Sequence, residues 1–146
     1  MDFDRERRMN RFVSELQRAK LLRSAIAVGA GGIAVALART TLSGDQPFGA
    51  QMQIRRSGDS PKWRKDGLLF GEQPGRFLLS CSADAEREII TRAAEANIFI
   101  GGEGRVGGES LSIAGDAECS VSVASARKIF LYGLKHIFDE SDLKLL

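Results

Sequence analysis

The longest uncharged stretch of the sequence, SAIAVGAGGIAVALA at residues 24–38, restricts the fold of this chain more than any other feature. It is shorter than the ~20 apolar residues that a membrane-spanning helix requires. Arg7 and Arg8 lie upstream, and the run 36–38 (Ala-Leu-Ala) resembles a signal-peptidase site. One interpretation is therefore an exported protein with a twin-arginine signal at residues 1–38. The alternative is a buried, glycine- and alanine-rich segment of a soluble protein.

Apolar periodicity upstream of this stretch favours the buried segment. Met9, Phe12, Val13 and Leu16 recur at the spacing of one helix face. The charged start of a signal peptide does not need such a face. We therefore predict an amphipathic N-terminal helix over residues 4–23, followed by a segment that belongs to the folded core.

Composition narrows the functional classes. The chain has 146 residues, 43% of them hydrophobic and 27% charged, which is typical of one globular domain. A net charge of +2 with scattered charges does not indicate a nucleic-acid partner, and no membrane partner is expected. With 2 cysteines and 1 histidine, the chain lacks the ligands of a Cys/His zinc site, so we predict no metal site. We expect a single cytoplasmic domain over residues 1–146.

The remaining periodicity predicts the order α-α-β-β-α-β-β-α, an α+β fold with helices packed on a mixed β-sheet. The expected helices after the first cover residues 33–41, 82–96 and 122–138, with a helical turn at 68–72; the expected strands cover residues 50–55, 76–81, 98–100 and 110–113. Residues 101–108 are dense in glycine and are expected to form a hairpin. Cys81 and Cys119 are expected to be small buried side chains.

Two glycine clusters are candidate phosphate sites. Residues 29–32 precede a helix, whose free N-terminal amides bind anions, although tight helix packing explains the same glycines. The spacing of Gly102, Gly104 and Gly107 matches a dinucleotide fingerprint, but a strand follows it where the fingerprint requires a helix. A glycine hairpin is the better interpretation of the second cluster.

Two polar segments are further candidate binding sites. Residues 68–76 (LLFGEQPGR) end in a Pro-Gly turn; Arg76 is suited to a phosphate and Glu72 to a metal or a substrate hydroxyl, while a solvated turn explains both. The basic and aromatic residues of 55–65 resemble a surface for single-stranded nucleic acid. Acidic residues dilute that charge, so a solvated loop is favoured. His136 is expected near the C-terminal end of the last helix, where it stabilises the helix dipole.

Three segments together, 24–38, 69–81 (LFGEQPGRFLLSC) and 104–113 (GRVGGESLSI), resemble the C-terminal domain of phosphoribosylformylglycinamidine synthase, in the PurM-like C-terminal domain family. The resemblance implies a PurM C-terminal-like fold and a ligase of purine biosynthesis. Such enzymes use ATP and magnesium to activate a formyl amide oxygen, which ammonia then displaces. Their site lies between this domain and an N-terminal nucleotide-binding domain, and no segment of this sequence resembles that second domain.

The departures from the family pattern are concentrated in the first motif. The family's His-Asp-Val-Ser-Asp-Gly-Gly falls on residues 26–32, where this chain has Ile-Ala-Val-Gly-Ala-Gly-Gly. Alanine and isoleucine neither ligate a metal nor transfer a proton. In the second motif Pro74 stands where the family often has serine. The phosphate- or substrate-binding residues that the resemblance still implies are Gly31, Gly32, Glu72, Gly75, Arg76, Gly107 and Gly108.

The sequence therefore predicts a synthase-like domain that is not catalytic alone, with no catalytic residue and a degenerate site. It would use no cofactor by itself, and ATP and magnesium only within a complete synthase. Expected partners are a second copy of the chain or a synthase subunit that carries the nucleotide-binding domain. Two alternatives stay open: a subunit of a split ATP-dependent synthase that supplies Glu72 and Arg76, and the exported protein.

Overall fold

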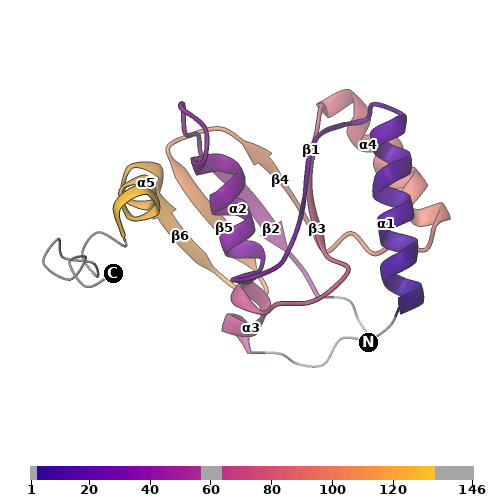
Figure 1. Ribbon diagram of the computed structural model, residues 1–146, viewed down its shortest axis with the longest axis horizontal. Helices are drawn as coiled ribbons and strands as arrows, with labels where there is room; N and C mark the ends of the chain where they lie inside the picture. Colours follow the sequence, from indigo (N-terminus) through magenta and orange to yellow (C-terminus); the bar gives the residue numbers. More distant parts are fainter. Residues whose placement is uncertain (1–2, 57–63, 134–146) are drawn as a thin grey trace, which may run out of the picture.

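The computed structural model describes residues 3–56 and 64–133. Within them, five helices accompany two sheets (Figure 1). The helices are α1 (Phe3–Arg18), α2 (Gly32–Leu42), α3 (Lys65–Phe70), α4 (Ala83–Glu95) and α5 (Val123–Tyr132). The strands are β1 (Leu22–Ala27), β2 (Ala50–Ile54), β3 (Phe77–Cys81), β4 (Gly102–Val106), β5 (Ser110–Gly115) and β6 (Cys119–Ser122). The predicted α+β class is confirmed.

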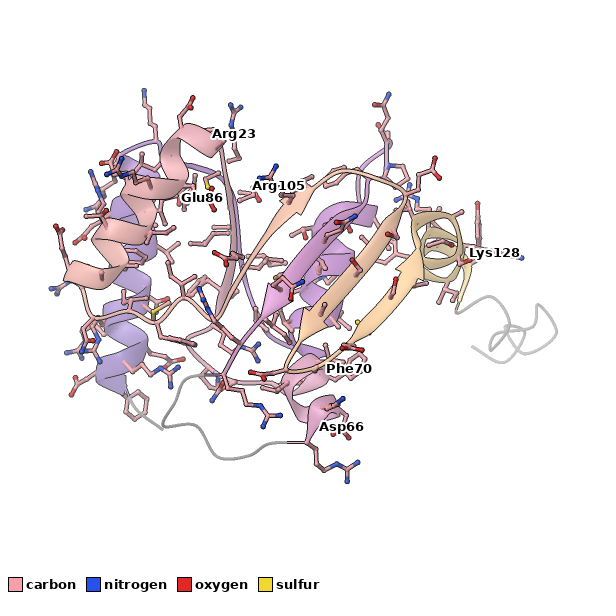
Figure 2. All side chains as sticks on the ribbon, turned by 180° about the vertical axis from the view of Figure 1, so that it is seen from behind. Arg23, Asp66, Phe70, Glu86, Arg105 and Lys128 are labelled. Atoms are coloured by element: carbon pink, nitrogen blue, oxygen red, sulfur yellow. The ribbon has the colours of Figure 1, made fainter. Side chains whose placement is uncertain are left out.

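The larger sheet has the order β4-β2-β5-β6 and is mixed, because β2 runs parallel to β5 and antiparallel to β4. Apolar and polar residues alternate along its strands, so Met52 and Ile54 face the core while Gln51 and Gln53 face outward. Helix α2 covers the apolar face, and Figure 2 shows the opposite face without a helix over it.

The core of this half surrounds α2. That helix is largely apolar, but it is not buried all round, because Val35 and Arg39 are exposed. The buried residues that pack together are Val28, Ile33, Ala36, Leu37, Leu42, Ala50, Leu69, Leu111, Ile113 and Ala117. They come from both halves of the described chain, so the core forms only when β5 joins β2.

The smaller sheet pairs β1 antiparallel with β3, and α1 and α4 lie beside it (Figure 1). A second apolar cluster joins these elements. Phe12 and Leu16 of α1 meet Ala93 of α4, and Leu79 of β3 packs against them. The one-sided apolar periodicity of α1 thus has the burial that the sequence predicts.

The first helix is shorter than expected, and a strand follows it. Helix α1 ends at Arg18 because Lys20 takes a left-handed conformation, φ 56°. The Leu21 N–H then donates to the Leu16 carbonyl at 3.1 Å, and the Lys20 N–H donates to the Gln17 carbonyl at 3.0 Å, a Schellman ending. The prediction of helix to residue 23 is wrong.

The uncharged segment 24–38 supplies parts of two elements, β1 and α2, rather than one continuous stretch. Strand β1 pairs with β3, and α2 contributes buried residues to the core. If residues 1–38 were a signal peptide that is cleaved off, the fold would lose β1 and the first part of α2. Among the residues described, no helix has the length and hydropathy to span a bilayer.

The predictions of a strand at 98–100 and of a hairpin at 101–108 are wrong: residues 102–106 form β4, which pairs with β2, and β2 separates β4 from β5 in the sheet. Helix α4 ends in a second Schellman motif: Asn97 has φ 53°, and the Ile98 N–H donates to the Ala93 carbonyl at 2.8 Å. The chain then runs as an irregular connection to Gly102. A side chain at Gly104 would lie 2.1 Å from the Gln51 carbonyl oxygen, so glycine permits the β4–β2 pairing.

Several smaller expectations are resolved as well. Strand β6 was not predicted, and α3 begins at Lys65 rather than at residue 68. The Ser122 side chain caps α5 by accepting from the Ser125 N–H at 3.2 Å, as expected. Residues 134–138, His136 included, and most of the basic segment 55–65 lie outside the described residues.

The expected burial of the cysteines is wrong for Cys81, which is exposed, while Cys119 is half-buried. Cys81 is the last residue of β3, where the chain leaves the sheet. The pKa of the Cys81 thiol is raised by partial burial and by the nearby Glu86 carboxylate.

Candidate functional site

The Gly31–Gly32 pair lies where the chain turns from β1 into α2. Both residues have left-handed backbones, with φ values of 79° and 66°. A side chain at Gly32 would lie 2.5 Å from the Leu69 carbonyl oxygen, because the end of α3 packs directly on the start of α2. A side chain at Gly31 would meet Val35 at 2.5 Å. Backbone conformation and packing therefore account for both glycines without a ligand.

The Gly75–Arg76 turn lies beside the start of α1. Gly75 has φ 73°, and a side chain there would come within 3.6 Å of the Glu6 Cγ atom. The Arg76 carbonyl accepts from the Val28 N–H at 2.9 Å, which ties the turn to the end of β1. Partial burial, assisted by the positive charge of Arg5, lowers the pKa of the Arg76 guanidinium.

Two of the three predicted segments are thus neighbours at one end of α2. The hydrogen bond from the Val28 N–H to the Arg76 carbonyl holds the Gly75–Arg76 turn beside the first motif, four residues before Gly32 in the sequence. Glu72 lies on the connection between α3 and β3 and is exposed. This end of the molecule offers a guanidinium, a carboxylate and glycine backbone, a combination that suits a phosphate or a hydroxyl-bearing ligand.

The third predicted segment lies at the opposite end. The Gly107 N–H donates to the Gly49 carbonyl at 2.7 Å, and the Gly49 N–H donates to the Gly108 carbonyl at 2.9 Å. Residue 48 in turn bonds to Thr41 in the last turn of α2. Because α2 has 11 residues and rises ~1.5 Å per residue, the two ends are separated by about 16 Å along its axis. Gly107 and Gly108 shape the β4–β5 turn there.

The exposed positions of the first motif carry no polar side chain. Ile26 is half-buried against the larger core and Val28 is 5% exposed. Ala27, Gly29 and Ala30 are exposed. No group of three or more His, Cys, Asp or Glu residues that could hold a metal is present within 3–56 and 64–133. The motif itself supplies neither a proton donor nor a metal ligand at this end.

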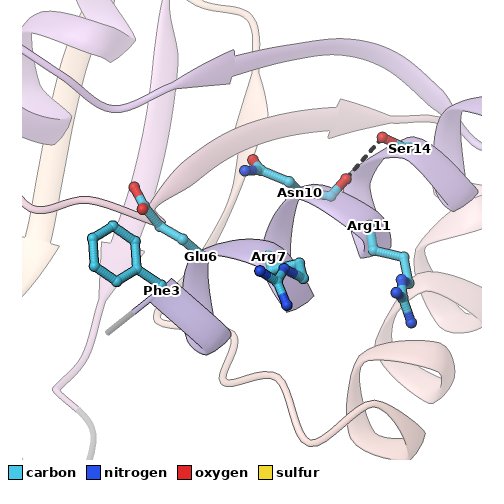
Figure 3. A pocket seen from close by; sticks show the side chains of 6 residues that line it. All are labelled: Phe3, Glu6, Arg7, Asn10, Arg11 and Ser14. Atoms are coloured by element: carbon cyan, nitrogen blue, oxygen red, sulfur yellow. Dashed lines mark hydrogen bonds between the residues drawn. The ribbon is translucent and has the colours of Figure 1, made fainter. Parts of the chain in front are cut away.

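Sequence reasoning missed the contribution of α1. Arg5 and Glu6 come from its first turn and lie beside Arg76 and Gly75. A shallow depression of about 500 Å³ runs along the same helix, and Figure 3 shows the side chains that line it: Phe3, Glu6, Arg7, Asn10, Arg11 and Ser14. Their spacing follows one helix face, but nothing in the sequence relates that face to a turn some seventy residues away.

Comparisons with known proteins bear on this arrangement. No family model matches the chain. The phosphoribosylformylglycinamidine synthase subunit PurL of Moorella thermoacetica is 33% identical over 113 residues, which is 77% of this chain and 14% of that protein. The subunit PurL of Anaeromyxobacter sp. (strain Fw109-5) is 33% identical over 137 residues, 92% of this chain and 18% of that protein.

Solved structures agree with the fold. Thermotoga maritima PurL complexed with FGAR superposes with a TM-score of 0.69 at 20% identity, covering 84% of this chain and 21% of that one. The same organism's PurL complexed with ATP superposes with a TM-score of 0.66 at 18% identity, covering 82% of this chain and 21% of that one.

Fold and site together define a PurM-like α+β domain. More particularly, the chain is homologous to the PurL subunit of phosphoribosylformylglycinamidine synthase, as the sequence motifs predict. It resembles part of that enzyme, spanning only 14% of the Moorella relative and 17% of the Wolinella succinogenes relative.

Proposed function

We propose that this chain is a single PurL-type domain that keeps the scaffold of the synthase and contributes no catalytic side chain of its own. The observation that carries the proposal is the exposed end of β1, where Ala27, Gly29 and Ala30 occupy the positions of the family's polar motif. Activating an amide oxygen by phosphoryl transfer needs metal-binding carboxylates and positioned proton donors. The degenerate motif has neither, so the domain alone is inactive.

The second step of the proposal concerns ligands. ATP and magnesium act only when a complete synthase is assembled, and the relatives that have been solved with ATP and ADP are far longer than this chain. Within such an assembly, Gly31, Gly32, Gly75 and Arg76 form the end that meets a substrate phosphate, and Glu72 accepts from a substrate hydroxyl. A half-buried guanidinium such as that of Arg76 binds phosphate through charge-assisted hydrogen bonds.

The proposed partner is a cytoplasmic synthase subunit that carries the nucleotide-binding domain. A Thermotoga maritima structure named PurLQS, which superposes with a TM-score of 0.67 over 81% of this chain, is the precedent for synthase chains in one assembly. Arg76 and the first motif lie at one end of the domain, and this end would face that partner. A phosphate bound between two domains needs a cation from at least one of them.

The test is amidine formation from formylglycinamide ribonucleotide with ATP, magnesium and ammonium. The purified chain alone should show no turnover, and calorimetry should detect no micromolar binding of the ribonucleotide. ATP-dependent amidine formation by the unaided chain would refute the proposal. A variant that restores the three exposed positions of the motif (Ala27→Asp, Gly29→Ser and Ala30→Asp together) should gain binding without disturbing the fold, whereas Ile26 packs against the core and is left unchanged.

The second candidate is an active piece of a split synthase, and the retention of Glu72 and Arg76 near one another favours it. Mixing the chain with a subunit that has the nucleotide-binding domain should then restore turnover. The Arg76→Ala variant should abolish that turnover, whereas Arg87→Ala, an exposed change on α4, should not. Equal activity of both variants would remove Arg76 from the site.

A further inference from the structure

Strand β4 presents an open sheet edge. It pairs with β2 on one side, and no other described strand pairs with it on the other. Glu103, Gly104, Arg105 and Val106 are all exposed, and Figure 2 shows Arg105 on this edge strand. Unpaired strand edges carry free backbone donors and acceptors and are templates for pairing with another strand.

The hydrogen bonds that flank the β2–β4 ladder reveal which backbone groups face outward. The Gly107 N–H donates to the Gly49 carbonyl at 2.7 Å, and the Arg55 N–H donates to the Gly101 carbonyl at 2.8 Å. Hydrogen-bonded and non-hydrogen-bonded pairs alternate along an antiparallel ladder. The odd-numbered residues of β4 therefore bond to β2, and the N–H and C=O groups of its even-numbered residues point to the open edge.

We propose that two copies of this chain associate by antiparallel pairing of their β4 strands about a twofold axis at Gly104. In this register the outward groups of Gly104 bond to those of the partner's Gly104. The outward groups of Gly102 bond to those of the partner's Val106, and the reverse. The even-numbered residues of both copies then form hydrogen-bonded pairs, which extends the four-stranded sheet across the axis.

Charge selects this register over its neighbours. With the axis at Gly104, Glu103 lies opposite the partner's Arg105, and Arg105 opposite the partner's Glu103. An axis at Glu103 or at Arg105 would place identical charges opposite each other, which destabilises a strand pair. The strand is thus complementary to itself in only one of the three central registers.

The side chains of β4 also suit a close partner. Gly102 and Gly104 carry no side chain on the inner face of the strand. Val106 is apolar, but 65% of it is exposed. Glu103 remains available, since its ion pair with Arg55 is long, 4.0 Å, and both side chains are more than half exposed. Strand pairing would cover Val106. It would also place the partner's Arg105 beside Glu103, as a second cation in addition to Arg55.

The association is expected to be weak. A junction of two five-residue strands buries less area than the ~1,600 Å² of a standard stable interface. Sedimentation velocity across about 10 μM to about 1 mM protein is therefore the appropriate measurement. The wild-type chain should shift from monomer to dimer within that range, and added salt should weaken the dimer. A monomer at every concentration would overturn the proposal.

Charge exchange provides the decisive variants. Glu103→Arg and Arg105→Glu each place like charges opposite in their own homodimer, and each should weaken dimerisation at least about tenfold. An equimolar mixture of the two should dimerise again, because every position then faces its opposite. The double variant Glu103→Arg with Arg105→Glu should dimerise like wild type. Failure of the mixture to recover would contradict the register.

A backbone variant tests the hydrogen bonds separately. Val106→Pro removes an N–H that points to the open edge, where proline is compatible with an edge strand. It should abolish dimerisation while circular dichroism remains that of the wild type. Arg87→Glu on α4 is the matched control and should dimerise normally. A dimer that survives both Val106→Pro and the single charge variants would use another surface, which would overturn the proposal.

Discussion

Replacing Gly32 with alanine is a direct test of how the first motif is built. The new Cβ would lie 2.5 Å from the Leu69 carbonyl oxygen and 2.7 Å from the Phe70 Cα. These are backbone atoms of α3, so relief requires one helix to move away from the other. The residue also has φ 66°, a conformation that costs a non-glycine residue about 1–2 kcal/mol.

Displacing α3 adds the cost of overpacking, about 1–3 kcal/mol. Gly32→Ala should therefore lower the free energy of unfolding by about 2–5 kcal/mol, a large share of the ~5–15 kcal/mol that stabilises an ordinary domain. The measurement is urea denaturation followed by circular dichroism, with the free energy extrapolated to water.

The motif contains its own control. A side chain at Gly29 meets nothing within 4 Å, and Gly29 has no positive φ, so Gly29→Ala should change stability by less than about 0.5 kcal/mol. Gly31→Ala should lie between the two, because its clash is with the Val35 side chain rather than with backbone. Equal stability of the Gly29 and Gly32 variants would refute the packing account.

Three further outcomes are expected from the same structure. Leu16→Ala should cost about 2–5 kcal/mol in chemical denaturation, because Leu16 is 0% exposed within the smaller core. Ser122→Ala should cost about 1 kcal/mol in thermal denaturation, because it removes the cap bond to the Ser125 N–H, and a Ser122→Asp variant should recover the loss. Glu86→Gln should lower the raised pKa of Cys81 and shift the pH profile of its alkylation by iodoacetamide to lower pH, since only the thiolate reacts; an unchanged profile would assign the raised pKa to burial alone.

Short-range patterns predicted the elements that contain their own signals. Helix α2 and helix α4 follow from continuous or one-sided apolar periodicity, and β2 from the strict alternation of residues 50–54. The cap at Ser122 also needs only neighbouring residues. The segments 24–38, 69–81 and 104–113 together indicate the synthase family from the sequence alone.

Strand β1 shows where such reasoning stops. Leu22–Ala27 lacks a clean alternation, with exposed residues at four of its six positions, and its partner β3 lies far away in the chain. The Ser24 and Ser80 hydroxyls, 2.6 Å apart across this pair, are separated by 56 positions. The sequence also does not predict strand β4, because glycine, which stands at positions 102 and 104, has a low strand propensity. These glycines allow the close approach of β2.

Residue chemistry along the chain was sufficient to indicate the class of fold, the likeness to the synthase and the absence of polar side chains between positions 26 and 30, because each of these is a property of side-chain type and spacing. The spatial grouping of the candidate site was not accessible in that way. Tertiary packing placed Gly32 and Arg76 at one end of α2 and Gly107 at the other, and it added Arg5 from α1. Distances between remote segments depend on how whole elements pair and pack, and no local pattern encodes them.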